Sequence, residues 1–284
     1  MEILKDRYLA IYSTKYYTVA PAHEVASLWD QLKTYLGAGD PTLSELDYMS
    51  LTHMLFDLSI FNRKDIEAES LFKTFQDRFG SNSPYLHVMQ ATLLQVNKGD
   101  NDAEEYLTKL LSGALEYETD IIDYLLVSKK LLSIRRKSLT KEKYLTQLLD
   151  LVEKFPVDGE LWYAIAQEYA SLGQFEQAAF SLEEVLCIAP FNYVAFAQLS
   201  EVLYCRALRE RKDKASLLQQ SLNNALRSVE LSETFVKGWA FVAVTAKELS
   251  KAKLLNLSKK KLREIMTGGN DTDKATAKKI LENL

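Results

Sequence analysis

The chain has 284 residues, of which 47% are hydrophobic and 26% are charged, and this balance is typical of a globular protein that can bury its own core. A formal net charge of −4 argues against a nucleic-acid partner, because phosphate groups attract a basic surface. The ten glycines and five prolines are few for this length, which predicts an all-helical protein with short turns rather than one with strands.

Apolar runs and cysteines exclude further classes of protein. The longest apolar stretches, such as 239–246, fall far short of the roughly 20 residues that cross a bilayer. The N-terminus carries charged residues before any apolar run, unlike a secretory signal, so we expect the chain to stay in the cytosol. Cys187 and Cys205 have no partner at metal-ligand spacing. We therefore expect both to be small core residues, and we expect no metal and no cofactor.

Residues 1–43 are predicted to form a helical segment that is amphipathic and rich in tyrosine. Two helical pairs follow, over 46–80 and 84–117, with small and apolar residues at the packing positions. These residues are Leu55, Phe56, Ala68, Phe72 and Phe75 in the first pair, and Ala91, Ala103, Leu107 and Leu110 in the second. A third pair, over 118–156, needs a longer link, because 129–143 adds residues between its helices.

The clearest pair occupies 159–192, between two apolar runs that end at Pro156 and at Pro190, 34 residues later. This period is the length of a tetratricopeptide repeat. The packing positions of that repeat are filled by Trp162, Ile165, Ala166, Tyr169, Ala178 and Leu182, with Pro190 as the terminating proline. The spacing of three and four residues places Trp162, Ile165 and Tyr169 on one helical face, so we expect Trp162 to be a core side chain.

Downstream, the pair over 193–235 is stretched, and its extra residues fall around 206–216. The last pair, led by Trp239, reaches to Met266, and 267–284 is predicted to form a C-terminal turn and helix. A lone hairpin cannot cover its apolar face, so neighbouring hairpins must stack. We therefore predict that 44–266 forms tetratricopeptide-like helical hairpins stacked into a right-handed α-α superhelix.

Such a superhelix has an inner groove, which is its default binding surface. The inward-facing positions of the first helices carry Tyr163 and Gln167, followed by Glu201 and Tyr204, and these four are the candidate partner-binding residues. They offer no cation to a carboxylate. The clamp with which co-chaperone adaptors of this repeat class hold the C-terminus of a heat-shock protein is therefore not recognised, although such an adaptor stays the alternative function.

Two basic runs, 129–143 and 206–214, are predicted to lie at the drawn-out turns. Their cations are either solvated near the C-terminal carbonyl groups of a helix, or they contact acidic partner loops or anionic headgroups. The amphipathic segment 251–266 also allows two interpretations, because such a helix either caps the superhelix or lies on a membrane surface.

No catalytic motif is recognised. His23, His53 and His87 lie in separate helical segments, with no nucleophile beside them in a known arrangement. Gly37-Ala38-Gly39 begins like a nucleotide-binding loop, but the rest of the motif is missing and no strand precedes it. We therefore expect no enzyme activity, and a site built from distant residues is the less favoured alternative.

The residues of the clearest repeat and its neighbour carry a family resemblance. The segments 160–169, 178–184, 190–192 and 200–204 together resemble the second-subunit family of the endoplasmic reticulum membrane protein complex. The likeness is strongest over 144–204, and the order and spacing of the helices over 46–266 are also similar. It does not cover the tyrosine-rich opening of the chain.

This resemblance implies a non-catalytic scaffold that is attached peripherally to the cytosolic face of the endoplasmic reticulum. It implies a hetero-oligomer with membrane-embedded subunits, including an insertase-type subunit. The chain would bind their cytosolic loops and tails and so support the insertion of transmembrane proteins. A nucleic-acid partner is not implied, and contact with the membrane would be indirect or peripheral.

Overall fold

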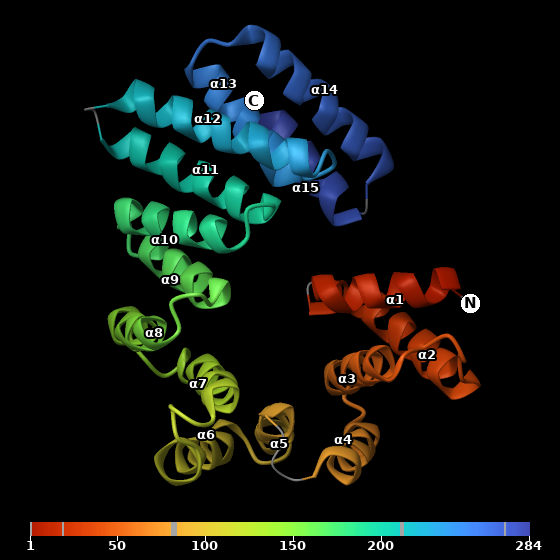
Figure 1. Cartoon of the computed structure of the whole chain (residues 1–284). Helices are drawn as coiled ribbons and strands as arrows, with labels where there is room; N and C mark the ends of the chain where they lie inside the picture. Colours follow the sequence, from red (N-terminus) through yellow and green to blue (C-terminus); the bar gives the residue numbers. More distant parts are fainter. Residues whose placement is uncertain (1, 19, 81–83, 211–212, 270) are drawn as a thin grey trace. The chain divides into compact units, whose positions relative to one another are not determined.

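The computed structural model describes residues 2–18, 20–80, 84–210, 213–269 and 271–284, and within these ranges the regular structure is entirely helical. The prediction of an all-helical protein is therefore confirmed. The chain divides into two compact units, Met1–Lys137 and Ser138–Leu284. In each unit, most helices that follow one another in the sequence pack side by side (Figure 1).

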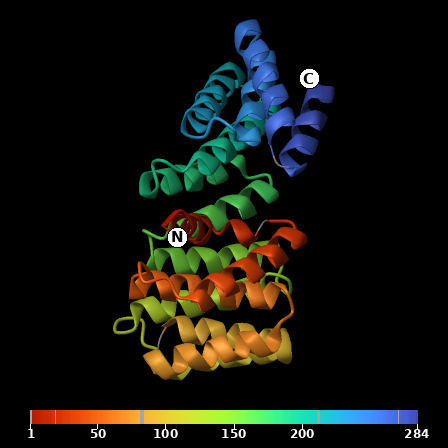
Figure 2. The same cartoon turned by 90° about the vertical axis from the view of Figure 1, so that its right-hand side faces the viewer.

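The first unit opens with α1 (Glu2–Thr14), the short 3-10 helix η1 (Tyr16–Thr18) and α2 (Ala22–Ala38). It continues with the pair α3 (Glu45–Phe61) and α4 (Asp65–Phe79), and then with the pair α5 (Pro84–Asn97) and α6 (Asp100–Lys109). A short π-helix, η2 (Leu110–Ala114), and α7 (Ile121–Arg135) complete it. Figure 2 shows α3 and α4, in orange, lying side by side.

The core of the first unit uses the small residues that the sequence pattern selects. Ala68, Ala91, Ala103 and Leu107 are fully buried, and each belongs to an apolar cluster between neighbouring helices. Alanine at these positions lets two helix backbones approach closely, while larger side chains fill the space on either side. The packing residues predicted for these two pairs are therefore confirmed, except that Phe72 and Leu110 lie at the half-buried edge of the clusters.

The second unit contains eight helices in its described ranges, 138–210, 213–269 and 271–284. They are α8 (Lys141–Lys154), α9 (Gly159–Ser171), α10 (Phe175–Ile188), α11 (Tyr193–Arg209), α12 (Lys214–Leu231), α13 (Val236–Glu248), α14 (Ala252–Gly268) and α15 (Asp271–Asn283). Helices α9 with α10, α11 with α12, and α13 with α14 form successive hairpins. The unit boundary divides the pair predicted over 118–156, because α7 packs against α5 and α6 whereas α8 packs against α9.

Side-chain caps and helix breakers explain why the hairpins of the second unit begin and end where they do. The carboxylate of Asp158 accepts a hydrogen bond from the amide of Leu161 at 2.9 Å, and the side chain of Asn192 accepts one from the amide of Ala195 at 3.0 Å. Each cap satisfies an amide that the first helical turn leaves unpaired. Helix α10 ends at Ile188, directly before Ala189 and Pro190, because the residue before a proline disfavours the helical backbone.

The extra residues of the pair predicted over 193–235 lie mainly in its helices and not in its turn, which corrects the prediction from sequence. Helix α11 has 17 residues where α9 has 13, and α12 has 18 where α10 has 14. Each helix of this hairpin is thus about one turn longer. The guanidinium of Arg206 contacts the carboxylate of Glu210 at 3.0 Å and supports the last turn of α11.

Most described residues of the two basic runs also lie in helices rather than in turns. In the run 129–143, α7 continues to Arg135, and the link to α8 over 136–140 is longer than the link over 172–174 between α9 and α10, as predicted. In the run 206–214, Arg206 and Arg209 belong to α11, whereas Arg211 and Lys212 lie outside the described residues. Lysine and arginine are good helix formers, so a basic run at the end of an apolar pattern can extend a helix.

Two predictions about the core are wrong. Trp162 is only half-buried, and its ring lies edge-on to the exposed ring of Phe180, with 6.0 Å between the centroids. Cys187 is exposed and Cys205 is half-buried, so neither is a core residue. Periodicity identifies the face of a helix that packs, but the depth of burial depends on the neighbouring helix, which a single repeat does not specify.

Helix α14 uses its apolar face inside the second unit. Leu262 and Ile265 are buried in a cluster with residues of α12, α13 and α15. This packing agrees with the interpretation of α14 as part of a cap, and it leaves that face unavailable to a membrane surface. No helix in the described ranges is long and apolar enough to span a bilayer.

Candidate functional site

The four predicted partner-binding residues lie on the first helices of two consecutive hairpins in the second unit. Gln167 of α9 is exposed, whereas Tyr163 of α9 is half-buried against the core of its hairpin. Tyr204 of α11 is also half-buried, and its ring lies edge-on to Phe241 of α13 with 6.2 Å between the centroids. Burial raises the pKa of the Tyr204 hydroxyl, so this tyrosine is neutral at physiological pH. Tyr163, Gln167, Glu201 and Tyr204 are called the row on α9 and α11 below. The two tyrosines of this row offer aromatic surface and hydroxyl groups to a partner.

Glu201 of α11 already has partners within the unit. Its carboxylate lies 2.7 Å from the ammonium of Lys237 on α13, and it accepts a hydrogen bond from the amide of Gln198 at 2.9 Å. The ammonium of Lys237 also donates to the side-chain oxygen of Gln198. The sequence pattern missed Lys237, a cation beside this row. Because Glu201 neutralises it, the row presents a paired charge rather than a lone cation.

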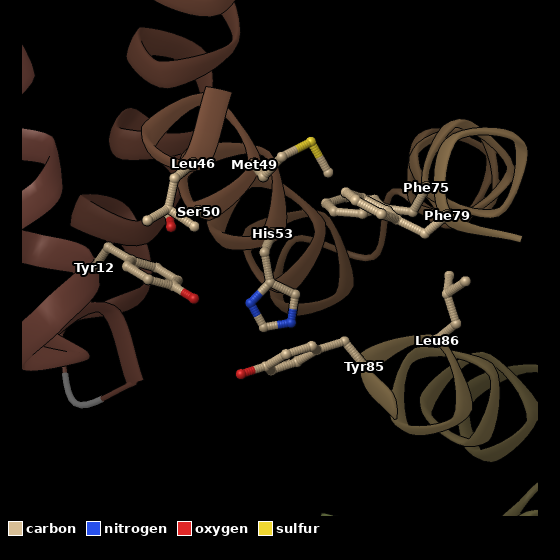
Figure 3. A pocket seen from close by; sticks show the side chains of 9 residues that line it. All are labelled: Tyr12, Leu46, Met49, Ser50, His53, Phe75, Phe79, Tyr85 and Leu86. Carbon is tan, nitrogen blue, oxygen red and sulfur yellow. The ribbon is translucent and has the colours of Figure 1, made fainter. Parts of the chain in front are cut away.

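A second candidate surface, in the first unit, is an apolar pocket with a volume of about 260 Å³ (Figure 3). Helix α3 supplies one wall, and α1, α4 and α5 supply the others. The lining residues are Tyr12, Leu46, Met49, Ser50, His53, Phe75, Phe79, Tyr85 and Leu86. Figure 3 shows the ring of His53 projecting from α3 between Tyr12 and Tyr85, with Phe75, Phe79 and Leu86 farther along the pocket.

His53 is the polar centre of this pocket. Its ring lies edge-on to Tyr12 and to Tyr85, with 6.1 Å between the centroids in each pair. Burial lowers the pKa of the imidazole, with Asp57 opposing this effect and Lys15 adding to it. The imidazole is therefore neutral at physiological pH. Its Nδ1 atom is buried and has no hydrogen-bond partner among the described residues.

The rim of the pocket is unusually apolar for an exposed surface. Leu46 is 76% exposed, Tyr85 is 57% exposed and Phe79 is 49% exposed. Single exposed apolar side chains are common, but a group of them around an apolar pocket marks a surface that binds another molecule.

Helix α3 carries apolar residues around its whole circumference, but most of them pack inside the unit. Leu51, Met54 and Leu58 lie in a cluster with α1 and α2, whereas Phe56 lies in a cluster with α4 and α5. The sequence pattern of α3 therefore gives no separate sign of the pocket.

Few of the groups that line the pocket are polar or reactive. Its polar groups are one hydroxyl from Ser50, two phenols and the neutral imidazole of His53. Burial raises the pKa of the Tyr12 phenol, with Tyr85 and Asp57 adding to the effect, so this group does not ionise at physiological pH. Within the described ranges, no group of three or more His, Cys, Asp or Glu side chains is arranged to hold a metal ion.

Comparison with known proteins finds relatives along the whole chain, although no family model matches it. The chain is 43% identical to ER membrane protein complex subunit 2 of Saccharomyces cerevisiae over 289 residues, which cover 100% of this chain and 99% of the yeast protein. It is 25% identical to the TPR repeat protein oca3 of Schizosaccharomyces pombe over 248 residues, which cover 87% of this chain and 81% of that protein.

Solved structures with the same fold have much lower sequence identity. A double mutant of MamA RS-1 is 13% identical, with a TM-score of 0.53 over 67% of this chain and 98% of that chain. PilF of Pseudomonas aeruginosa is 12% identical, with a TM-score of 0.53 over 81% of this chain and 97% of that chain. At such identities the likeness concerns the fold alone. The predicted fold class of tetratricopeptide-like helical hairpins is confirmed.

Proposed function

Because the chain belongs to the family of ER membrane protein complex subunit 2, we propose that it is a non-catalytic scaffold subunit of that complex. It binds cytosolic loops and tails of membrane-embedded subunits, including an insertase-type subunit, and thereby supports the insertion of transmembrane proteins. The observation that carries this proposal is the likeness to the yeast subunit, which extends from one end of the chain to the other. The protein is then one member of a hetero-oligomer.

The physical character of the two candidate surfaces supports a binding role. The row on α9 and α11 offers the half-buried rings of Tyr163 and Tyr204 beside the exposed amide of Gln167. The pocket of the first unit offers apolar walls with an apolar, exposed rim. Stacked helical hairpins typically use extended surfaces of this kind to hold peptide segments. Both surfaces suit extended segments of other proteins better than they suit a small substrate.

The proposed location is the cytosolic face of the endoplasmic reticulum membrane, with peripheral attachment through the membrane-embedded partners. Contact of the chain with lipid is proposed to be indirect or peripheral. The basic side chains of α7 and α11 are not proposed as the main contact, because Arg135 already pairs with Glu104 and Arg206 with Glu210. A nucleic-acid partner is not proposed, since the net charge of the chain is −4.

The alternative function, a co-chaperone adaptor for heat-shock protein C-termini, has less support from the second unit. An adaptor of that kind needs free cations to hold a carboxylate. Lys237 is a cation beside Gln198, and it is already bound by Glu201. A carboxylate would have to displace that ion pair before it could bind there.

The proposed function is tested by co-purification from membranes. The tagged chain is recovered in a mild detergent, and mass spectrometry identifies the proteins that accompany it at fixed stoichiometry. A defined set of multi-spanning proteins of the endoplasmic reticulum is the expected result. Recovery of soluble heat-shock proteins instead would favour the adaptor, and recovery of no partner at all would contradict the scaffold.

A further inference from the structure

The apolar pocket of the first unit has the size of a side chain. Its volume is about 260 Å³, whereas sites for cofactors and other small molecules usually measure about 300 to 1,000 Å³. Large side chains that anchor protein interfaces commonly fill pockets of this kind. The volume therefore suits one bulky side chain of another protein, and it lies just below the usual range for a free ligand.

The walls of the pocket favour an aromatic ring over an aliphatic side chain. Tyr12, His53, Phe75, Phe79 and Tyr85 all contribute rings, and Figure 3 shows them on several sides of the same space. Rings attract one another edge to face, as His53 already does with Tyr12 and Tyr85. The thioether of Met49, which also lines the pocket, makes favourable contacts with the edge of a ring.

The electrostatic character of the pocket excludes a charged guest. None of the lining residues is an aspartate, a glutamate, a lysine or an arginine, and His53 is neutral because it is largely buried. A charged side chain would lose its hydration in this pocket without gaining an ion pair. The exposed rim of Leu46, Phe79 and Tyr85 extends the apolar surface beyond the pocket, so the guest is held by a segment that covers this rim.

We propose that this pocket receives an aromatic side chain from a cytosolic segment of a partner subunit, which docks over the rim formed by α3, α4 and α5. This inference rests on the proposed function, because it takes the partner to be a subunit of the same complex. It adds the chemical nature of the anchor and the place where the anchor binds. Ser50 and Met49 lie at one wall of the occupied pocket, and Leu86 lies at another.

The first test fills the pocket from within. Ser50→Trp places a ring where the guest would lie, and Ser70→Trp, on the exposed surface of α4, adds the same ring outside the pocket as a matched control. We expect Ser50→Trp to reduce the recovery of membrane partners at least about tenfold, while Ser70→Trp leaves it unchanged. Circular dichroism melting of both variants verifies that they are folded. Normal recovery of partners by a folded Ser50→Trp protein would overturn the inference.

The second test does not depend on how well Ser50→Trp folds. A photo-crosslinking phenylalanine analogue replaces Tyr85 at the rim, or Ile66, which is 83% exposed at the start of α4, as a control. We expect Tyr85 to cross-link, within the assembled complex, to a peptide of a partner subunit that contains Phe, Tyr or Trp, and we expect no such product at Ile66. Recovery of the complex without a cross-link at Tyr85, or with a cross-link to a peptide that lacks an aromatic residue, would contradict this inference alone. A wild-type chain that recovers no membrane subunits would contradict the proposed function, and this inference with it.

Discussion

Trp162 and Trp239 make the same hydrogen bond at the same position of two different hairpins. The indole nitrogen of each donates to the carbonyl oxygen six residues earlier, which belongs to Pro156 at 2.8 Å and to Glu233 at 2.7 Å. Each bond ties the first turn of a hairpin to the segment that precedes it. The two rings differ in burial, since Trp239 is buried and Trp162 is half-buried.

This difference predicts unequal effects of the same substitution. Trp239→Ala removes a buried ring and should lower the free energy of unfolding by about 3 to 5 kcal/mol. Trp162→Ala removes a ring that keeps part of its hydration, and should cost only about 1 to 3 kcal/mol. Urea unfolding of the full chain, followed by circular dichroism, measures both. Equal losses for the two variants would show that the burial of the ring does not determine its contribution.

A close approach between α12 and α13 predicts that Gly238→Ala is destabilising. A Cβ atom at Gly238 would lie 2.7 Å from Cγ1 of Val229 and 3.0 Å from Oγ of Ser228. The helices must separate or the side chains must move, and we expect a loss of about 1 to 3 kcal/mol. Gly37→Ala in α2 is the matched control, since nothing lies within 4 Å of its added Cβ. That variant should gain about 0.5 to 1 kcal/mol in thermal or urea unfolding.

Because of Asp40, we expect the free energy of unfolding of the first unit to fall in acid. Hydrogen bonds from Tyr35, at 2.7 Å, and from Thr42 lower the pKa of Asp40 to about 2. A pKa that is lower in the folded state stabilises the fold above the unfolded value near 3.8. This contribution is lost as the pH falls from about 3.8 to about 2. The Tyr35→Phe variant should show a smaller loss over the same range, measured by melting at several pH values. An unchanged pH dependence in that variant would be inconsistent with this role of Tyr35.

The ion pair between Glu201 and Lys237 should contribute little to stability. Both side chains are about one-third exposed, so water and salt screen their attraction. A double-mutant cycle with Glu201→Gln and Lys237→Met should give a coupling free energy of about 0.2 to 1 kcal/mol, and a smaller one in concentrated salt. A coupling well above this range would mean that the pair is structurally important, which would make these residues poor probes of partner binding.

Sequence periodicity was sufficient for the fold because turns and helix starts are local properties. Asp158 and Asn192 cap their helices through amides three residues away, and Pro190 lies directly after the residue that ends α10. The length of α11 was misjudged because Arg206 and Arg209 were interpreted as part of a turn, although arginine favours helices. The predicted boundaries at 43 and 266, and the partner-binding roles of Tyr163, Gln167, Glu201 and Tyr204, stay predictions.

The pocket of the first unit could not be predicted in the same way. Its walls come from four helices, and the distance in sequence from Tyr12 to Tyr85 spans most of the unit. Single-helix patterns carry no information about which side chains of different helices meet. The apolar residues of α3 give no such sign either, because they pack against α1 and α2 in one cluster and against α4 and α5 in another.

The additional turn of α11 reaches back to the hairpin that precedes it. Helix α11 is four residues longer than α9, which amounts to about 6 Å of helix. In its last two turns, the guanidinium of Arg209 donates to the carbonyl oxygen of Gly173 at 3.2 Å and lies over the ring of Phe175. The guanidinium of Arg206 lies 3.4 Å from the carboxylate of Glu176. The longer helix therefore fastens the turn between α9 and α10 from outside, so that two successive repeats are joined by side chains as well as by their stacked faces.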